Sequence, residues 1–266
     1  MVDTVIELSP PSMQELPREV YVRQQNMPAR HLFAPHTHPW HQLLFATSGT
    51  LVTRLKAQRL FVPSGTAVWL PAGCTHSTYT EFGAELKSLY IHVSYTAFER
   101  QSPLVLEISD LMRELILTAS NFDPEYPPHG YENDLVQFML STLSRMPQKE
   151  HTLPWPSDSR LANLCAQLYS SPDARPSMTQ IANTLAMSAR TLERHFRRET
   201  GMSLQGWCSR MRLMKAVEML GTDMSITQIA LELGYGSPAP FIMTFREQLG
   251  LSPNRYRLQR RGGQTT

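Results

Sequence analysis

Three histidines in the first third of the chain have a spacing that would let them bind one ligand together. His36 and His38 are two residues apart in a stretch rich in β-forming residues, and His76 lies in a later stretch of the same kind. Alternation along a strand places His36 and His38 on one face, and His76 on a neighbouring strand would face the same interior. Three converging imidazoles can bind a divalent metal such as zinc or nickel.

Three interpretations of these histidines stay open, because imidazole serves all three roles. They could line an effector pocket together with Gln42, they could hold a metal ion, or they could be hydrogen-bonded core residues. Trp40, Trp69, Tyr79 and Tyr90 are near them in sequence and could form apolar walls. Each of these aromatic residues is equally compatible with an ordinary core.

A second group of residues, near the C-terminus, points to nucleic acid. Leu192 and Phe196 are four residues apart and would face inward on a helix. The opposite face would present two arginines and a glutamate that could reach base edges together, followed by two arginines that could meet phosphates. A solvated helix face would have a similar composition. The outward residues are Arg190, Glu193, Arg194, Arg197 and Arg198.

The same helix belongs to an internal repeat. Ser177-Met-Thr-Gln-Ile-Ala182 recurs as Ser225-Ile-Thr-Gln-Ile-Ala230, 48 residues later. Each copy begins with Ser-x-x-Gln, a capping box that starts a helix sharply. A second cap follows in each copy, at Ser188 and at Ser237. Helix, tight turn and helix is the helix-turn-helix arrangement, and two copies favour DNA binding over a merely solvated face.

The segment between the copies predicts a connecting helix from Ser203 to Leu220. It is apolar at Trp207, Met211, Met214 and Leu220 and basic at Arg210, Arg212 and Lys215. Eighteen residues of α-helix span about 27 Å. That length can hold two recognition helices about 34 Å apart, which is one turn of DNA. We therefore expect one chain to contact two adjacent half-sites on double-stranded DNA.

Charge and composition support this division of labour. Residues before Ser157 include 11 Lys and Arg against 15 Asp and Glu, whereas Ser157 onward has 14 against 8. Only the basic half is suited to a polyanion. Three cysteines with unrelated spacing, no secretory signal and no long apolar run predict a cytoplasmic protein that does not enter the membrane.

These sites need two domains to position them. Short β-rich runs from about Val20 to Val93, such as Gln42 to Thr47 and Gly49 to Arg54, predict a small β-barrel. After Pro103 the spacing becomes helical, from Leu104 through Ile108 and onward, and predicts two helices. The predicted fold is α+β: a sensor domain over residues 1–146, a proline-rich linker over 147–158, and an all-α DNA-binding domain of two helix-turn-helix units over 159–262.

The C-terminal region closely resembles the AraC/XylS family of transcriptional regulators over roughly residues 159–257. Many positions carry this resemblance in order along the chain. They are Ile181-Ala182, Ser188, Leu192, Arg194, Phe196, Gly201, Arg212, Ala216, Leu220, Ile226, Ile229-Ala230, Gly234-Tyr235, Phe241, Phe245, Gly250, Ser252-Pro253 and Tyr256-Arg257.

The resemblance implies base contacts from both recognition helices. In the first helix these are Arg190, Glu193 and Arg194. In the second they are Ala239, Pro240 and Met243, which depart from the frequent polar residues and would contribute thymine-methyl contacts and shape fit, with Arg246 on phosphate. The resemblance also implies a homodimer formed through residues 104–145, with RNA polymerase as a further possible partner.

The N-terminal region resembles the cupin superfamily. His36, His38, Gly49, Gly65, Pro71, Gly73 and His76 have the spacing of its two sequence motifs. Two positions depart from the pattern, because Gln42 stands where the usual carboxylate would be and Thr80 stands where the usual asparagine would be. A missing anionic ligand weakens a site for hard metals and argues against oxygenase-type iron chemistry.

Together these features predict a transcriptional regulator, not an enzyme, whose DNA binding is modulated by a small molecule or metal in the barrel. A cupin-type metalloenzyme with an accessory helical domain is the alternative, and Gln42 disfavours it. A third possibility is an RNA-binding or architectural protein, which would not need paired recognition helices.

Overall fold

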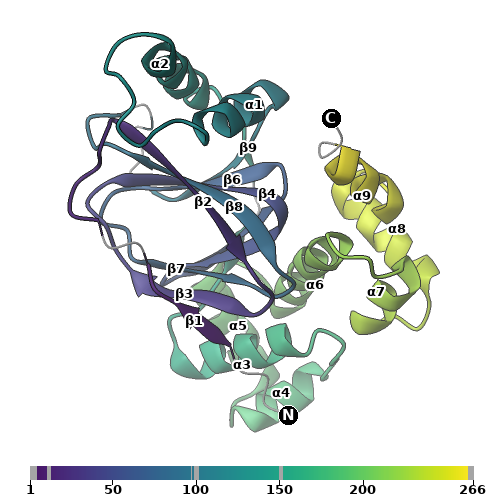
Figure 1. The fold of residues 1–266 in the computed structure, drawn as a ribbon. Helices are drawn as coiled ribbons and strands as arrows, with labels where there is room; N and C mark the ends of the chain where they lie inside the picture. The colour runs from purple at the N-terminus through teal and green to yellow at the C-terminus, as the bar shows by residue number, and fades with distance from the viewer. Residues whose placement is uncertain (1–4, 11–12, 97, 99–101, 150–151, 263–266) are drawn as a thin grey trace. The chain divides into compact units, whose positions relative to one another are not determined.

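A computed structural model describes residues 5–10, 13–96, 98, 102–149 and 152–262, and the side chains up to residue 259. Contacts divide it into two compact units. The first holds the described residues up to Leu55 and from Leu60 to Lys149, and the second holds Lys56–Arg59 and the residues from Thr152 onward. A sheet-rich unit followed by a helical unit confirms the predicted α+β class (Figure 1).

The first unit contains two β-sheets that share one long strand. The first half of β4 pairs with β6 and β8, its second half pairs with β7, and the register shifts between Ala46 and Ser48. The predicted strands 42–47 and 49–54 are therefore one bent strand. The strands are β1 (Ile6–Leu8), β2 (Val20–Met27), β3 (His31–His36), β4 (His41–Arg54), β5 (Gln58–Pro63), β6 (Thr66–Leu70), β7 (His76–Thr80), β8 (Ala84–Ile91), β9 (Leu104–Glu107) and β10 (Gln148–Lys149).

Alternating side chains of β4 build two cores. Leu44 and Ala46 face the space between the two sheets, where Val68 and Leu86 also pack. Leu43 and Phe45 point to the opposite face, which is covered by α1 (Asp110–Ala119) and α2 (Tyr131–Leu143) (Figure 1). Because β4 is apolar on both faces, it can lie between two buried layers.

The helical periodicity that we expected from Leu104 is wrong at its start. Leu104–Glu107 forms strand β9 and pairs with β6, and α1 begins only after Ser109, whose side chain accepts a hydrogen bond from the Met112 amide. Val105 and Leu106 are both buried, each in a different core. Burial on opposite faces is a β pattern that a search for helical spacing does not detect.

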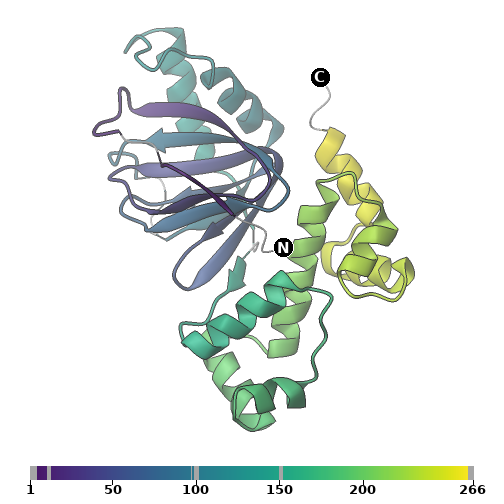
Figure 2. The same cartoon turned by 60° about the horizontal axis from the view of Figure 1, so that its bottom comes forward.

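The second unit contains the two repeated helix pairs with a long helix, α6, between them (Figure 2). Trp207 and Met211 of α6 are fully buried, as expected, but Lys215 is buried too, where its ammonium pairs with Glu218 at 3.2 Å. The elements of this unit are β11 (Thr152–Pro154), α3 (Ser159–Ser170), α4 (Met178–Thr184), α5 (Ala189–Thr200), α6 (Leu204–Leu220), α7 (Ile226–Glu232), α8 (Pro238–Leu249) and α9 (Pro253–Gly262).

All four predicted serines of the repeat are the N-cap residues of their helices, and three of them form capping hydrogen bonds through their side chains. Ser177 and Ser225 each form a complete capping box, and the Ser188 hydroxyl accepts a hydrogen bond from the Thr191 amide. Ser237 precedes α8 as expected, but its side chain makes no capping hydrogen bond. The third helical residue there is Pro240, which has no N–H to donate to the Ser237 hydroxyl.

Candidate functional site

The first recognition helix, α5, has one buried and one exposed face. Leu192 and Phe196 are fully buried, as the spacing predicts. Arg190 and Arg194 are exposed and form no ion pair within the described part of the chain. Two unpaired guanidinium groups one helical turn apart can reach neighbouring acceptors in a major groove.

The other charged residues on the outer face of α5 have neighbours of opposite charge. Glu193 has one carboxylate oxygen 3.3 Å from the Arg197 guanidinium and the other 3.4 Å from the Leu204 amide at the start of α6. Arg198 is exposed and lies 3.9 Å from Glu199. The Leu204 amide and the Arg197 guanidinium thus hold the Glu193 carboxylate in place, and Arg197 forms an ion pair with it.

The second recognition helix, α8, exposes a mainly apolar surface. Ala239 and Pro240 are exposed near its start, and Met243 is 60% exposed in its middle. Arg246 is exposed near its end, whereas Phe241 and Phe245 face the core. The two recognition helices therefore have similar buried faces, but the exposed face of α5 is mainly charged and that of α8 is mainly apolar.

Sequence reasoning missed a cluster that ties the start of this unit to α5. Glu199 accepts hydrogen bonds from the amide and the hydroxyl of Ser157, at 3.1 and 2.7 Å, and from the amide of Asp158. His195 Nε2 lies 3.7 Å from the Asp158 carboxylate, which caps α3. His195 and Glu199 are four residues apart, so their spacing predicts that they share one face of the helix. The spacing does not predict their partners, Ser157 and Asp158, which are about forty residues away in the sequence.

The three predicted histidines of the first unit come together. His36 ends β3, His38 lies in the following loop and His76 begins β7. The ring centroids of His36 and His76 are 4.4 Å apart, and those of His38 and His76 are 5.2 Å apart. One possible ligand atom from each residue lies within 4.8 Å of the others.

Backbone carbonyls fix which ring nitrogen of each histidine is protonated. The Nδ1 atoms of His36, His38 and His76 lie 2.7, 2.8 and 3.0 Å from the carbonyls of Ala34, Trp40 and Cys74. A carbonyl only accepts, so each Nδ1 carries the hydrogen and each neutral ring has its lone pair on Nε2. Metal-binding histidines commonly have their other nitrogen held in this way.

Burial keeps two of these rings neutral. It lowers the pKa of His76 to about 4 and also lowers the pKa of His38. Both imidazoles are therefore uncharged near pH 7 and can accept a hydrogen bond or bind a cation.

Gln42 lies beside the cluster. Its side-chain amide is 3.1 Å from His38 Nε2 and 3.1 Å from the Ser88 hydroxyl. The structure places Gln42 Oε1 against this Nε2 and has the NH2 group donating to Ser88. Because the Nε2 has a lone pair, the flipped amide, with NH2 toward His38 and Oε1 accepting from the Ser88 hydroxyl, is the consistent assignment. No carboxylate joins the cluster among the described residues. This neutral nitrogen set fits zinc, nickel or cobalt better than magnesium, calcium or manganese.

Two of the four aromatic residues considered above lie against the cluster. The Trp40 ring stacks on His38 with centroids 5.6 Å apart, and Tyr90 meets His38 edge-on at 5.9 Å. The indole N–H of Trp40 is buried without a hydrogen-bond partner among the described residues. An unmet donor beside three imidazoles is compatible with a polar ligand as well as with a metal. Trp69 instead packs on His41, at 4.8 Å.

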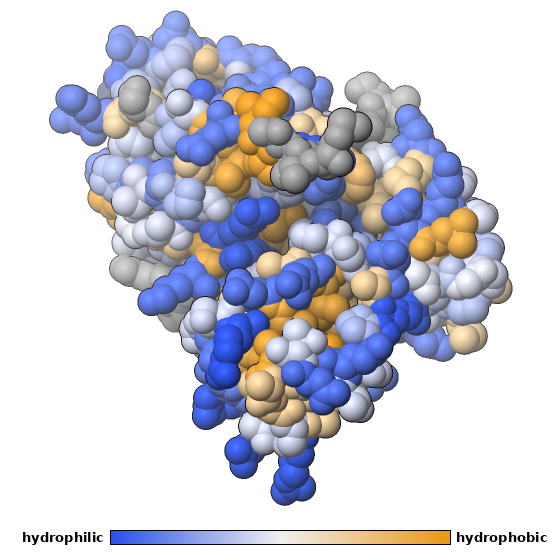
Figure 3. All heavy atoms as spheres, turned by 90° about the horizontal axis from the view of Figure 1, so that it is seen from below, coloured by the Kyte–Doolittle hydropathy of each residue, from blue (hydrophilic) through white to orange (hydrophobic). Residues whose placement is uncertain are grey.

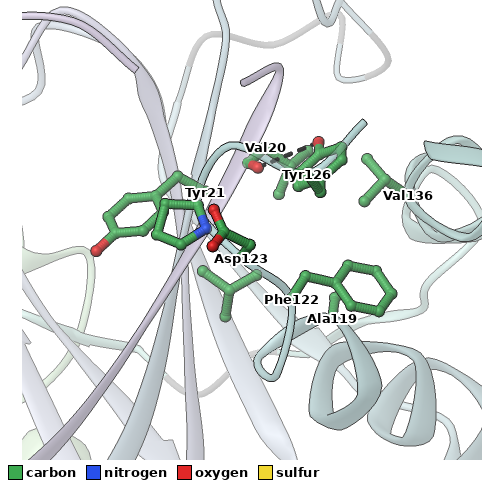
Figure 4. A pocket seen from close by; sticks show the side chains of 9 residues that line it. Val20, Tyr21, Ala119, Phe122, Asp123, Tyr126 and Val136 are labelled. Atoms are coloured by element: carbon green, nitrogen blue, oxygen red, sulfur yellow. Dashed lines mark hydrogen bonds between the residues drawn. The ribbon is translucent and has the colours of Figure 1, made fainter. Parts of the chain in front are cut away.

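Two hollows lined by described residues lie away from the histidines. One lies between β2 and the segment after α1, lined by Tyr21, Phe122 and Tyr126 (Figure 4), and its volume of about 10 Å³ leaves room for about one water. The other, of about 480 Å³, lies between α3 and α4 with Leu164 and Ile181 in its lining. Apolar atoms gather in the part of the surface formed by these helices (Figure 3). The second hollow is of small-molecule size, and no residue of α5 or α8 lines it.

None of the helices in the described ranges is long and apolar enough to cross a membrane. Cys74, Cys165 and Cys208 are all free thiols.

Comparison with known proteins assigns both units. Residues 20–119 match the AraC-like ligand binding domain, and residues 181–259 match a helix-turn-helix domain. The HTH-type transcriptional regulator NimR of Escherichia coli (strain K12) is 32% identical over 221 residues, which cover 83% of this chain and 81% of NimR. The HTH-type transcriptional activator RhaS of Enterobacter sp. (strain 638) is 24% identical over 257 residues, covering 85% of this chain and 87% of RhaS.

Solved structures of lower similarity include ToxT from Vibrio cholerae, with 12% identity, a TM-score of 0.38 and coverage of 91% of this chain and 98% of ToxT. The DNA-binding domain of AdpA, solved with a target DNA, is 31% identical over 38% of this chain and 92% of that domain, with a TM-score of 0.36. These scores are too low to add to the fold described above. The relatives in sequence are regulators, not enzymes, and the chain belongs to the AraC family of transcriptional regulators, with an AraC-like ligand-binding domain and a helix-turn-helix DNA-binding domain.

Proposed function

We propose that this regulator binds a specific double-stranded DNA sequence by placing α5 and α8 in successive major grooves. The observation that carries the proposal is the repeat itself: two capped helix pairs within one unit, each with an exposed recognition face, joined by α6. Seventeen residues of α6 span about 26 Å, which suits helices that contact grooves one turn apart.

In α5, Arg190 and Arg194 contact base edges, because both are exposed and unpaired in the described chain. Arg197 and Arg198 contact phosphates. Glu193, which the resemblance places among the base contacts, reaches DNA only if its carboxylate leaves Arg197 and the Leu204 amide. Ser188 caps α5 and so fixes where the N-terminal end of this helix begins, which is the end that enters the major groove.

In α8, the contacts are mainly apolar. Met243 and Ala239 pack against thymine methyl groups, and Pro240 shapes the first turn. Arg246 and the exposed Ser237 contact the DNA backbone. Polar discrimination between bases therefore comes chiefly from α5.

Effector control comes from the histidine cluster of the first unit. Its ligand is a metal such as zinc or nickel, held by the Nε2 atoms of His36, His38 and His76, or a small polar molecule that also meets Gln42. The carbonyl-held Nδ1 atoms and the unmet Trp40 donor support such a ligand. Bound metal would supply a positive charge beside the uncharged His38 and His76 imidazoles.

The regulator acts as a homodimer in the cytoplasm, and RNA polymerase is a further partner. Leu111 of α1 and Phe138 of α2 support the dimer, since they are 52% and 53% exposed although their helices are amphipathic. Exposed apolar residues on helices that already cover a sheet are suited to a second subunit.

Selection from a random pool tests the DNA proposal. The full chain is mixed with random-sequence duplex DNA, and bound duplexes are sequenced; the same is done with single-stranded DNA and duplex RNA. We expect enrichment of duplex DNA with two half-sites about one turn apart. Equal retention of single strands or RNA, or retention without sequence enrichment, would overturn the proposal.

A further inference from the structure

The loop that leads into the first helix-turn-helix copy contacts the second copy directly, in addition to the connection through α6. The loop between α3 and α4, residues 171–177, reaches the turn between α7 and α8 (Figure 1). This loop immediately precedes the first helix of copy one, and the turn belongs to copy two. The two copies are thus connected at two places: through α6, and through the contact between this loop and this turn.

The closest approach is between backbones. A Cβ at Gly234 would lie 2.6 Å from the carbonyl oxygen of Asp173 and 2.9 Å from its Cα. Contacts this short do not occur for real Cβ atoms, so only glycine lets the loop and the turn come together. Gly234 also has φ +75°, which favours glycine for a separate reason.

Side chains on both sides support the approach. The Arg175 guanidinium lies 4.9 Å from the centroid of the Tyr235 ring, and it is 3.5 Å from the carbonyl of Leu233. From α6, Arg212 donates hydrogen bonds to the carbonyls of Pro172 and Ala174, at 3.0 and 3.2 Å. The loop is therefore held from α6 and from copy two. We call residues Asp173, Arg175, Arg212, Gly234 and Tyr235 the inter-copy lock.

We propose that the inter-copy lock sets the distance and angle between α5 and α8, and so selects the spacing of the two half-sites. This inference rests on the proposed function, because it assumes that both helices contact DNA. Copy two packs in one core with the C-terminal part of α6, so α6 sets most of its position. The contact between copy two and the loop before α4 adds a second constraint, which limits bending of α6 between the two copies.

The physical consequence is a penalty for changed spacing. One added base pair moves the second half-site by about 3.4 Å and turns it by about 35° around the duplex axis. If the geometry of the DNA-binding unit is fixed, the protein or the DNA must distort for both helices to contact the shifted half-sites. A unit without the lock can adjust the distance between its helices at a lower cost in free energy. The lock thus makes Gly234 and Arg175 positioning residues for spacing, with no contact to DNA required of Gly234.

The test compares full-length variants on duplexes taken from the random-pool selection. Each protein is titrated with the selected duplex and with versions that have one base pair added or removed between the half-sites. Gly234→Ala closes the space against Asp173. Gly250→Ala is the matched control: Gly250 has nearly the same φ, +74°, but a Cβ at this position would meet nothing within 4 Å.

We expect the unmodified chain to prefer the selected spacing by about tenfold or more, which corresponds to about 1.4 kcal/mol. Gly234→Ala should reduce that preference at least threefold, and Gly250→Ala should preserve it. Arg175→Gln, which leaves the backbone unchanged, should weaken the preference in the same direction and serves if Gly234→Ala does not fold.

Two failures can be told apart. If no duplex is enriched in the selection, the proposed function itself is wrong. If a duplex is selected but Gly234→Ala and Arg175→Gln discriminate spacing as well as the unmodified chain and Gly250→Ala do, the lock does not set the spacing.

Discussion

Arg190 and Arg194 stand out among the arginines of α5 because neither is committed to a neighbour within the described chain. Arg197 is paired with Glu193, and Arg198 lies near Glu199. A bidentate arginine contact with guanine needs an unoccupied guanidinium, so the unpaired pair is better suited to base contacts.

Arg194→Ala should therefore weaken binding of the selected duplex by about 1–3 kcal/mol and relax selectivity at one base position. Competition binding with single-base variants of the duplex measures both effects. Arg198→Ala is the comparison, because loss of a phosphate contact weakens all duplexes alike. An Arg194→Ala protein that loses specific and nonspecific affinity equally would show that Arg194 contacts only phosphate.

His76 gives the first unit a pH dependence with a definite sign. The unfolded chain binds a proton at His76 with a pKa near 6.5, whereas the folded protein binds it with a pKa of about 4. The unfolding free energy of the metal-free protein is therefore highest above pH 6.5 and falls as the pH drops, by about 1.5 kcal/mol between pH 6.5 and 5.

Denaturant unfolding of the first unit at a series of pH values measures this slope, with EDTA present. His76→Gln should flatten it, whatever it does to stability at pH 7. An unchanged slope in His76→Gln would mean that another group causes the pH dependence.

At the scale of elements, the turns of the two helix-turn-helix copies both contain a residue in the left-handed backbone conformation, but the residue type differs. Gly234 has φ +75° in copy two, and the corresponding turn of copy one has Ala186 at φ +53°. A left-handed conformation costs an alanine about 1–2 kcal/mol, whereas glycine adopts it without that penalty.

Ala186→Gly should consequently raise the unfolding free energy of the helical unit by about 0.5–1 kcal/mol, once the greater entropy of unfolded glycine is subtracted. Thermal unfolding of the full chain measures the change. Ala162→Gly, within α3, is the matched control and should have the opposite sign, because there the alanine is helical. A loss of stability in both variants would show that Ala186 is not strained.

The sequence allowed the elements of the second unit to be predicted well, because their signals are local. The capping boxes at Ser177 and Ser225 and the inward pair Leu192 and Phe196 depend only on neighbours along the chain. Ser237 is the N-cap residue of α8 as predicted, and its side-chain hydrogen bond is missing for an equally local reason, the proline at position 240. Contacts between distant segments, such as Gly234 with Asp173, leave no periodic pattern to detect.

The first unit was harder to predict in detail. The convergence of three histidines followed from their spacing, but their fixed Nδ1 hydrogens depend on backbone carbonyls that only the fold supplies. Strand β9 was missed because its partner, β6, is more than thirty residues away along the chain. Pairing between strands, and not the composition of β9, decides its conformation.

At the scale of the whole molecule, the acidic and basic halves of the chain correspond to the different tasks of its two units. The proposed dimer would join two DNA-binding units and so increase affinity for paired operators. Its interface would involve the outer faces of α1 and α2, where Leu111 and Phe138 are exposed.

Phe138→Asp should convert the dimer to a monomer without unfolding the first unit, since the side chain is 53% exposed. Sedimentation analysis over a range of concentrations measures the oligomeric state. Leu258→Asp, at a residue 69% exposed in α9, should leave the dimer intact. A Phe138→Asp protein that remains dimeric, or an unmodified chain that is monomeric at all concentrations, would place the association elsewhere or exclude it.

The most direct measurement of the central claim combines two footprints of the full chain on the selected duplex: methylation protection, which reports major-groove contacts at guanines, and uracil interference, which reports contacts with thymine methyl groups. Two patches of contacted bases about 10 base pairs apart on one face of the duplex are expected for each chain, with only the patch under α5 changed by Arg194→Ala. One patch alone, or two patches on opposite faces, would contradict the claim that α5 and α8 occupy successive major grooves.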